Sequence, residues 1–249
     1  NAGFGDPETQ VVLPRMKTDI VDVFEACVDG TLDQIDLEFE NNAAVCVVLA
    51  SGVAALSGLF FALLNQGDHV IFSSVTYIAV YRLLNELLNN KFGVETTLVD
   101  TTDPANVEAA IRPNTKLIHI ETPGNPTLMI SDIAAISDIA HRHGALLSVD
   151  NTFASPYNQR PIELGADFAV ESLTKYINGH GDSMGGAIIG KREYLDQIRA
   201  TSQVNLGGAI SPFNAWLIMR GSASTMKTPW LWQHGWNGSH VSALWPIRD

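Results

Sequence analysis

Short apolar segments alternate with longer helix-like segments through the middle of the chain. The predicted strands are residues 44–50, 69–74, 94–100, 116–121, 145–150, 167–172 and 186–190. The predicted helices are residues 52–64, 75–89, 106–111, 132–143 and 191–200. Nearly continuous apolar strands that alternate with helices are typical of a parallel sheet covered on both faces. We therefore predict an α/β fold with a large, mostly parallel central sheet.

Composition and charge narrow the class of protein. The chain has 249 residues, of which 46% are hydrophobic and 17% charged, as in a globular protein with a substantial core. Its net charge of −12 argues against a nucleic-acid partner, because phosphate binding needs clustered Lys and Arg. No apolar run is long enough to span a membrane and no secretory signal is visible. Cys27 and Cys46 have neither metal-binding nor disulfide spacing, so we expect a cytoplasmic protein.

The pattern divides the chain into three regions. Residues 1–43 show no clear strand pattern and are expected to form an N-terminal segment. Residues 44–220 carry the alternation and are expected to form one large domain. The alternation stops after Arg220, so residues 221–249 are interpreted as a linking helix and tail. All five tryptophans lie at or after Trp216, and such apolar side chains would need a partner surface.

Functional side chains are expected where the predicted strands end, because ligands of α/β sheets bind outside the carboxyl ends of the strands. The segments at these ends are 51–52, 74–77, 121–125, 150–151 and 172–175. Together they supply a helix start that can bind an anion, an aromatic ring, an amide, a carboxylate and an amine. The pattern is neither a P-loop nor the Gly-x-Gly-x-x-Gly fingerprint, which disfavours a nicotinamide-dependent dehydrogenase.

Each group alone has an ordinary interpretation. Ser51-Gly52 could form only a tight turn, Asp150 could cap a turn, and Lys175 could be a solvated surface amine. The spacing between Asp150 and Lys175 suits one crossover, which would place the two on adjacent strands at one edge. Pyridoxal-phosphate chemistry needs this combination of groups. The cofactor forms a Schiff base with a lysine, and an acid keeps its ring nitrogen protonated.

Four segments carry a resemblance to a known family. They are ETPGNPT, SVDNTFASPYNQRPIELGAD, ESLTKYINGHGD and SPFNAWLIMRG, and they resemble the Cys/Met-metabolism family of pyridoxal-phosphate enzymes. This family includes cystathionine γ-synthase, cystathionine β- and γ-lyases and methionine γ-lyase. The resemblance covers residues 31–221 and is most specific over 121–186. It implies a fold-type I aminotransferase-like large domain, pyridoxal 5′-phosphate as cofactor, a small amino-acid substrate and a homotetramer.

The resemblance also implies roles for individual residues. Lys175 matches the Schiff-base lysine, which can also move protons at the α- and β-carbons of the substrate. Asp150 matches the carboxylate paired with the pyridine nitrogen, and Tyr77 the ring-stacking tyrosine that assists the chemistry. Asn125 matches the amide that contacts the ring oxygen.

The phosphate site is implied by a second set of matches. Ser172 and Thr174 match phosphate-binding hydroxyls, and Gly52 and Val53, next to Ser51, supply backbone N–H groups. His180 is interpreted as a structural, hydrogen-bonded residue, and His141 and His143 as surface residues on a helix. No metal site is expected.

Two elements of the family pattern are not found in this sequence. One is a Tyr-Ser-Arg-like stretch before the first helix, and the other is a C-terminal domain whose arginine binds the substrate carboxylate. The first hypothesis is a lyase or γ-replacement enzyme acting on sulfur amino acids or activated homoserine. The alternative is a degenerate relative that keeps the fold, with or without the cofactor, and acts as a binding or assembly partner. The sequence leaves β- and γ-elimination open.

Overall fold

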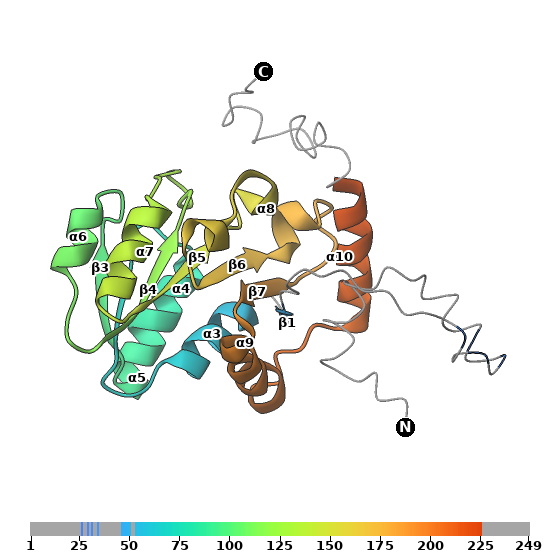
Figure 1. The fold of residues 1–249 in the computed structure, drawn as a ribbon, viewed down its shortest axis with the longest axis horizontal. Helices are drawn as coiled ribbons and strands as arrows, with labels where there is room; N and C mark the ends of the chain where they lie inside the picture. Colours follow the sequence, from blue (N-terminus) through green and yellow to red (C-terminus); the bar gives the residue numbers. More distant parts are fainter. Residues whose placement is uncertain are drawn as a thin grey trace, which may run out of the picture. The chain divides into compact units, whose positions relative to one another are not determined.

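A seven-stranded sheet forms the centre of the computed structural model, which describes residues 26, 29, 31, 34, 46–50 and 53–225 (Figure 1). The strands are β1 (Cys46–Ala50), β2 (His69–Ser73), β3 (Glu95–Val99), β4 (Thr115–Glu121), β5 (Leu146–Asp150), β6 (Phe168–Ser172) and β7 (Gly186–Gly190). Their order in the sheet is β1-β7-β6-β5-β4-β2-β3. The pairings from β3 through β6 are parallel, and β7 pairs with β6 antiparallel. The predicted strands and the mostly parallel sheet are thus confirmed.

Helices connect the strands and follow the last of them, β7. They are α3 (Ala54–Leu63), α4 (Ile78–Tyr81), η3 (Arg82–Asn89), α5 (Asn90–Phe92), α6 (Pro104–Ala109), α7 (Ile133–Arg142), α8 (Ser155–Asn158), η4 (Pro161–Leu164), η5 (Leu173–Ile177), α9 (Arg192–Arg199), η6 (Ala200–Asn205) and α10 (Pro212–Thr225). The start of α6 follows from local chemistry: the Asp103 side chain accepts a hydrogen bond from the Ala105 N–H at 2.9 Å, and Pro104 is the first helical residue. The sequence reading of Asp103-Pro104 as an N-cap followed by proline at the first helical position is thus confirmed, and the helix-like stretch 106–111 lies after this start.

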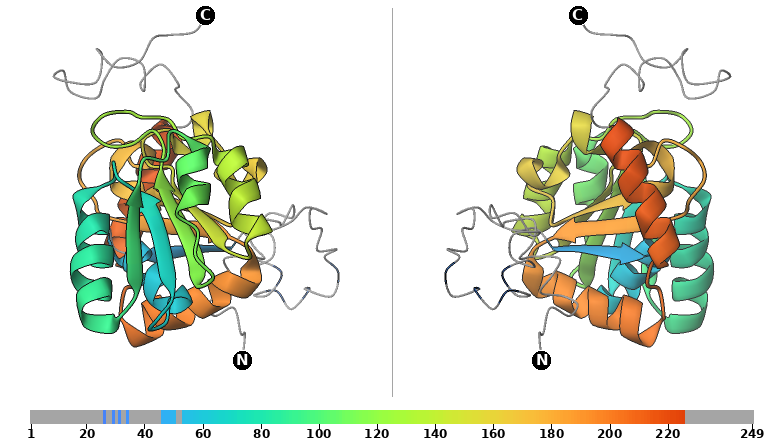
Figure 2. Two further views of the ribbon diagram at one scale, coloured as in Figure 1. Left: turned by 90° about the vertical axis from the view of Figure 1, so that its left-hand side faces the viewer. Right: turned by 90° about the vertical axis from the view of Figure 1, so that its right-hand side faces the viewer.

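The helices cover both faces of the sheet (Figure 2). On one face, Ile118 and Leu147 belong to a buried cluster with Ile136 of α7 and Val107 of α6. On the other face, His119 lies edge-on to Phe60 of α3, with ring centroids 5.2 Å apart. Successive strand residues point to opposite faces, so this alternation decides the face on which each site residue lies.

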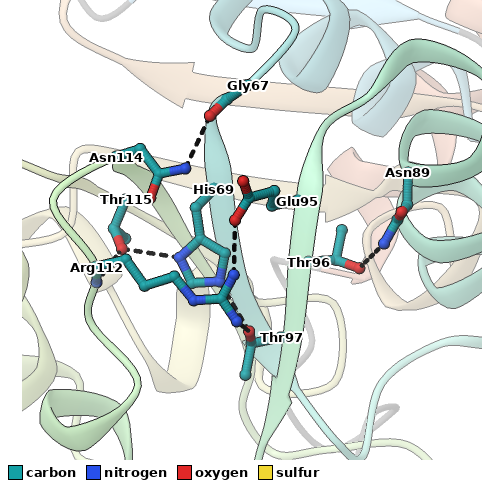
Figure 3. Close-up of polar contacts among 9 residues, drawn as sticks. All are labelled: Gly67, His69, Asn89, Glu95, Thr96, Thr97, Arg112, Asn114 and Thr115. Atoms are coloured by element: carbon teal, nitrogen blue, oxygen red, sulfur yellow. Dashed lines mark hydrogen bonds and ion pairs between the residues drawn. The ribbon is translucent and has the colours of Figure 1, made fainter.

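A cluster of hydrogen-bonded polar side chains lies toward the amino ends of β2, β3 and β4 (Figure 3). His69 lies 2.8 Å from both the Thr115 and Thr97 hydroxyls through its two ring nitrogens. Arg112 donates to Glu95 at 2.7 Å and to Thr97 at 3.0 Å. Burial, together with the Arg112 charge, lowers the pKa of His69 to about 4, so the imidazole is neutral. The ring nitrogens of His69 have partners, which gives this cluster a structural role.

The chain divides into two compact units, Asn1–Val47 and Val48–Asp249. Most of the first unit and the Trp-rich tail beyond Thr225 lie outside the described residues. The expected boundaries, with segments 1–43, 44–220 and 221–249, remain predictions.

Candidate active site

The carboxyl ends of β4, β5 and β6 lie next to one another. Glu121 is in register with Asp150, and Asp150 with Val170 of β6. Lys175 follows β6 within η5, where its backbone angles (φ −90°, ψ −115°) depart from the helical turn. Its side chain is exposed. The expectation that Asp150 and the lysine-bearing segment come from adjacent strands is confirmed.

Asp150 is a buried carboxylate with few partners. Its side chain accepts a hydrogen bond from the Thr152 N–H at 3.1 Å, and only 7% of the residue surface is exposed. Burial raises the pKa of Asp150 above its ordinary value. Within residues 53–225, none of the ion pairs joins Asp150 to a cation. The site therefore presents a buried acid that a cationic group could stabilise.

Glu121 lies beside Asp150 and points to the same face of the sheet. Its Oε2 accepts hydrogen bonds from the Tyr77 N–H at 2.6 Å and the Thr76 hydroxyl at 3.2 Å. Its Oε1 accepts from the Asn125 N–H at 2.9 Å. Burial, followed by the neighbouring Asp150 charge, raises the pKa of Glu121 to about 7. The sequence pattern indicates Glu121 only as a strand end, and an acidic side chain that closes an apolar strand is the signal for it.

A third buried acid, Glu171, faces the opposite side. Because Val170 shares the face of Asp150, Glu171 points away from it and accepts from the Asn151 Nδ2 at 2.7 Å. Gln159 in turn donates to Asn151 at 2.8 Å. Burial raises the pKa of Glu171 to about 8. This network joins β6 to the segment after α8 and lies on the face away from Asp150.

The other predicted site residues are distributed around this edge. Tyr77, 42% exposed, lies directly before α4, and Asn125 is half-buried in the loop after β4. Val53, 40% exposed, lies directly before α3. Ser51 and Gly52 lie outside the described residues.

The lysine loop, residues 173–185, is held by contacts of its own. The Thr174 hydroxyl donates to the Gly185 carbonyl at 3.3 Å and accepts from the Gly185 N–H at 3.0 Å. Ser172, at the entry to the loop, donates its N–H to the Thr152 hydroxyl at 2.8 Å. The loop carries an ion pair between Asp182 and Arg220 of α10.

His180 and His141 have the structural surroundings that the sequence suggested. The His180 Nδ1 lies 2.6 Å from the Asn178 carbonyl oxygen within the lysine loop. His141 lies on α7 with 47% of its side chain exposed and contacts Asp167 at 3.0 Å.

Comparison with known proteins decides the family. A family model described as Cys/Met metabolism PLP-dependent enzyme matches residues 26–234. The chain belongs to this family. Its cofactor, pyridoxal 5′-phosphate, is the one that the sequence indicated.

Relatives with assigned activities match about three quarters of the chain. A canavanine γ-lyase of Pseudomonas canavaninivorans is 56% identical over 178 residues, which are 72% of this chain and 44% of that protein. An L-methionine γ-lyase of Treponema denticola is 44% identical over 191 residues, 76% of this chain and 46% of that protein. The crystal structure of cystathionine γ-lyase from Lactobacillus plantarum with L-serine matches with a TM-score of 0.69 at 42% identity. That match covers 73% of this chain and 48% of the crystallised chain. This chain therefore spans about half the length of the relatives. The predicted fold class is confirmed.

The chemistry of the described residues fits the family's cofactor. Asp150 is a buried carboxylate with no cationic partner among the described residues, which suits a protonated ring nitrogen. The exposed amine of Lys175, in the helical turn that follows the next strand, suits a carbonyl group. Within the part of the chain that the structure describes, no cluster of His, Cys, Asp and Glu could hold a metal ion. In that same part, no helix combines the length and apolar character needed to cross a bilayer.

Proposed function

We propose that this chain is the cofactor-binding part of a pyridoxal-phosphate-dependent enzyme that eliminates or replaces the γ-substituent of a sulfur amino acid. The observation that carries the proposal is the buried Asp150 carboxylate, which pairs with no cation among residues 53–225 and lies on the strand next to the Lys175 segment. A methionine γ-lyase, cystathionine γ-lyase or cystathionine γ-synthase type of reaction agrees with the relatives.

Asp150, Tyr77 and Asn125 are proposed to hold the ring of the cofactor. Asp150 would pair with the ring nitrogen, Tyr77 would stack on the ring face, and Asn125 would contact the ring oxygen. When bound, the cofactor supplies an electron-withdrawing ring that makes a proton on the α-carbon of the substrate easier to remove. Asp150 contributes by keeping the ring nitrogen protonated, through a charge-assisted hydrogen bond.

The phosphate is proposed to lie at the start of α3 and the start of the lysine loop. Its ligands would be the N–H groups of Gly52 and Val53, adjoining Ser51, and the hydroxyls of Ser172 and Thr174. A helix start offers unpaired N–H groups to an anion. Thr174 would exchange its 3.3 Å hydrogen bond to the Gly185 carbonyl for one to a phosphate oxygen.

Lys175 is proposed as the catalytic residue. Its exposed amine can reach solvent and ligand, and it would hold the cofactor before substrate arrives. Once released, the same amine would take the proton from the α-carbon and move a proton at the β-carbon. Lys175 thus combines a nucleophile and a base in one side chain.

A second substrate class has support from the relatives. Two proteins at 56% identity are canavanine γ-lyases, and canavanine carries an oxygen-linked guanidine group at its γ-carbon instead of sulfur. The two substrate classes share loss of a γ-substituent and differ in the leaving atom. Turnover measured side by side on methionine, cystathionine, a homoserine ester and canavanine distinguishes them.

The wider properties remain proposals as well. We propose a cytoplasmic homo-oligomer, in keeping with the family resemblance. The competing proposal, a degenerate binding or assembly protein, differs in one observable. A working enzyme changes the absorbance of its bound cofactor when an amino acid is added, whereas a binding protein does not.

Borohydride reduction tests the proposed function. The reagent fixes pyridoxal phosphate to the amine that holds it, and we expect the label on the peptide that contains Lys175. Lys116 and Lys191 are exposed and serve as internal controls for nonspecific labelling. The Lys175→Ala variant should lose both the label and turnover. Label on Lys116 or Lys191 at the wild-type level would refute the assignment of Lys175.

A further inference from the structure

One carboxylate joins two separate loops of the proposed cofactor site. Glu121 accepts hydrogen bonds from the main-chain N–H of Tyr77, in the turn before α4, and from that of Asn125, in the loop after β4. The two donors bind different oxygens of the carboxylate, at 2.6 and 2.9 Å. The Thr76 hydroxyl adds a third contact at 3.2 Å. A single carboxyl group therefore bridges the two loops.

The two loops carry the side chains proposed to contact opposite parts of the cofactor. Tyr77 is proposed to stack on the ring and Asn125 to contact the ring oxygen. Glu121 fixes the main chain of both residues and leaves their side chains available. Glu121 is the last residue of β4 and is in register with Asp150, which is proposed to hold the ring nitrogen. The ring would thus be bounded by groups whose spacing depends on Glu121.

We propose that Glu121 is a positioning residue of the active site, whose carboxylate holds the Tyr77 and Asn125 loops at the separation that the cofactor ring requires. This inference rests on the proposed function. It differs from a purely structural role because it assigns the effect of Glu121 to the placement of two particular side chains.

The electrostatic surroundings support the same role. An ionised carboxylate accepts stronger hydrogen bonds than a neutral acid, so the contacts with the Tyr77 and Asn125 N–H groups are strongest when Glu121 is charged. Burial and the Asp150 charge oppose ionisation and raise its pKa to about 7. A cation paired with Asp150 would reduce that repulsion and favour the charged form of Glu121. Binding of a protonated ring at Asp150 would accordingly strengthen the contacts that place Tyr77 and Asn125.

The test compares Glu121→Gln with Glu171→Gln in the protein loaded with pyridoxal phosphate. A glutamine at 121 keeps one acceptor oxygen and places an amide group where the second main-chain N–H needs an acceptor. We expect kcat/KM to fall roughly 10- to 100-fold, the loss typical of one charge-assisted hydrogen bond. The visible circular dichroism of the bound cofactor should change as well, because it reports the position of the stacked ring. Glu171→Gln, a buried acid on the opposite face, should change neither.

A double-mutant cycle separates positioning from general stability. In a Tyr77→Ala background there is no ring left to misplace, so Glu121→Gln should cost clearly less than in the wild type. Should Glu121→Gln fold poorly, Thr76→Val removes only the hydroxyl donor and should shift the dichroism in the same direction with a smaller loss. Additive effects of Glu121→Gln and Tyr77→Ala on kcat/KM would overturn this inference and leave the proposed function standing. Wild-type dichroism in both Glu121→Gln and Thr76→Val would do the same. Failure of the wild-type protein to bind the cofactor would overturn the proposed function and this inference together.

Discussion

Replacing Glu171 by glutamine should stabilise the cofactor-free domain at neutral and alkaline pH and leave its stability unchanged near pH 4.5. Glu171 is only 2% exposed, and burial raises its pKa from an ordinary value of 4.5 to about 8. Glutamine keeps the oxygen that accepts the 2.7 Å hydrogen bond from Asn151 and cannot ionise. The substitution thus removes the cost of titration without removing the contact.

The magnitude follows from linkage between protonation and folding. Below pH 4.5 the acid is protonated in both the folded and the unfolded state, so its full contribution to stability is present. As pH rises from 4.5 to about 8 the unfolded state ionises first, and stability is lost progressively. Each pKa unit corresponds to about 1.4 kcal/mol, so the loss at pH 7 reaches about 3 kcal/mol. Glu121, with a pKa of about 7, also lowers the free energy of unfolding as pH rises, and the Glu171→Gln variant retains that loss.

Urea unfolding of the wild-type and Glu171→Gln proteins between pH 4.5 and 9 measures this effect. The variant should lose less stability with rising pH, and the two curves should meet near pH 4.5. Glu95→Gln is a control of opposite sign, because the hydrogen bond from Arg112 lowers the pKa of Glu95. Identical pH slopes for the wild type and Glu171→Gln would show that Glu171 ionises normally in the folded protein, and would refute the reasoning.

Three further substitutions test other parts of the structure. Asp150→Asn should keep part of the cofactor and lower turnover by several orders of magnitude, because an amide cannot hold the ring nitrogen protonated; wild-type rates would remove Asp150 from the mechanism. Gly221→Ala should lower the free energy of unfolding by about 1–3 kcal/mol, because the new Cβ would overlap the Asn178 carbonyl; unchanged urea midpoints would contradict that packing. Thr174→Val should weaken cofactor binding about tenfold in an absorbance titration whereas Thr174→Ser should not, since serine keeps the hydroxyl that valine lacks; equal binding by both would exclude Thr174 from the phosphate site.

The sheet could be predicted because its strands are buried on both faces and therefore read as apolar runs. The Asp103-Pro104 pair likewise predicts the start of α6, because the Asp103 side chain caps the helix. The direction of β7 could not be predicted, because the 13 residues between β6 and β7 are enough for either a crossover or a return loop. The pattern predicts a helix over residues 75–89, whereas α4 begins at Ile78, since the Tyr77 main chain donates to Glu121 instead.

The placement of Asp150 and the Lys175 segment at the ends of adjacent strands could be predicted from the sequence, because their spacing fits one crossover. Glu121 could not be assigned a role in the same way. Its partners are main-chain N–H groups, which every residue except proline carries, and the Tyr77 donor is 44 residues away in sequence. Only the fold brings that donor to the carboxylate. The proposed phosphate ligands Ser51 and Gly52 lie outside the described residues and stay predictions.

The antiparallel return of β7 onto β6 lets the lysine loop close over a short stretch of chain. Thr174 and Gly185 are joined across 11 residues, whereas His119 and Ser148 are joined across 29 and His69 and Thr115 across 46. The entropy lost on closing a loop grows with its length, and pairings of large sequence separation slow folding. The segment that carries the amine is therefore among the least demanding parts of the domain to form. The pairing of β4 with β5, which aligns Glu121 and Asp150, spans the α7 crossover, so the acidic half of the site depends on contacts between residues farther apart in sequence.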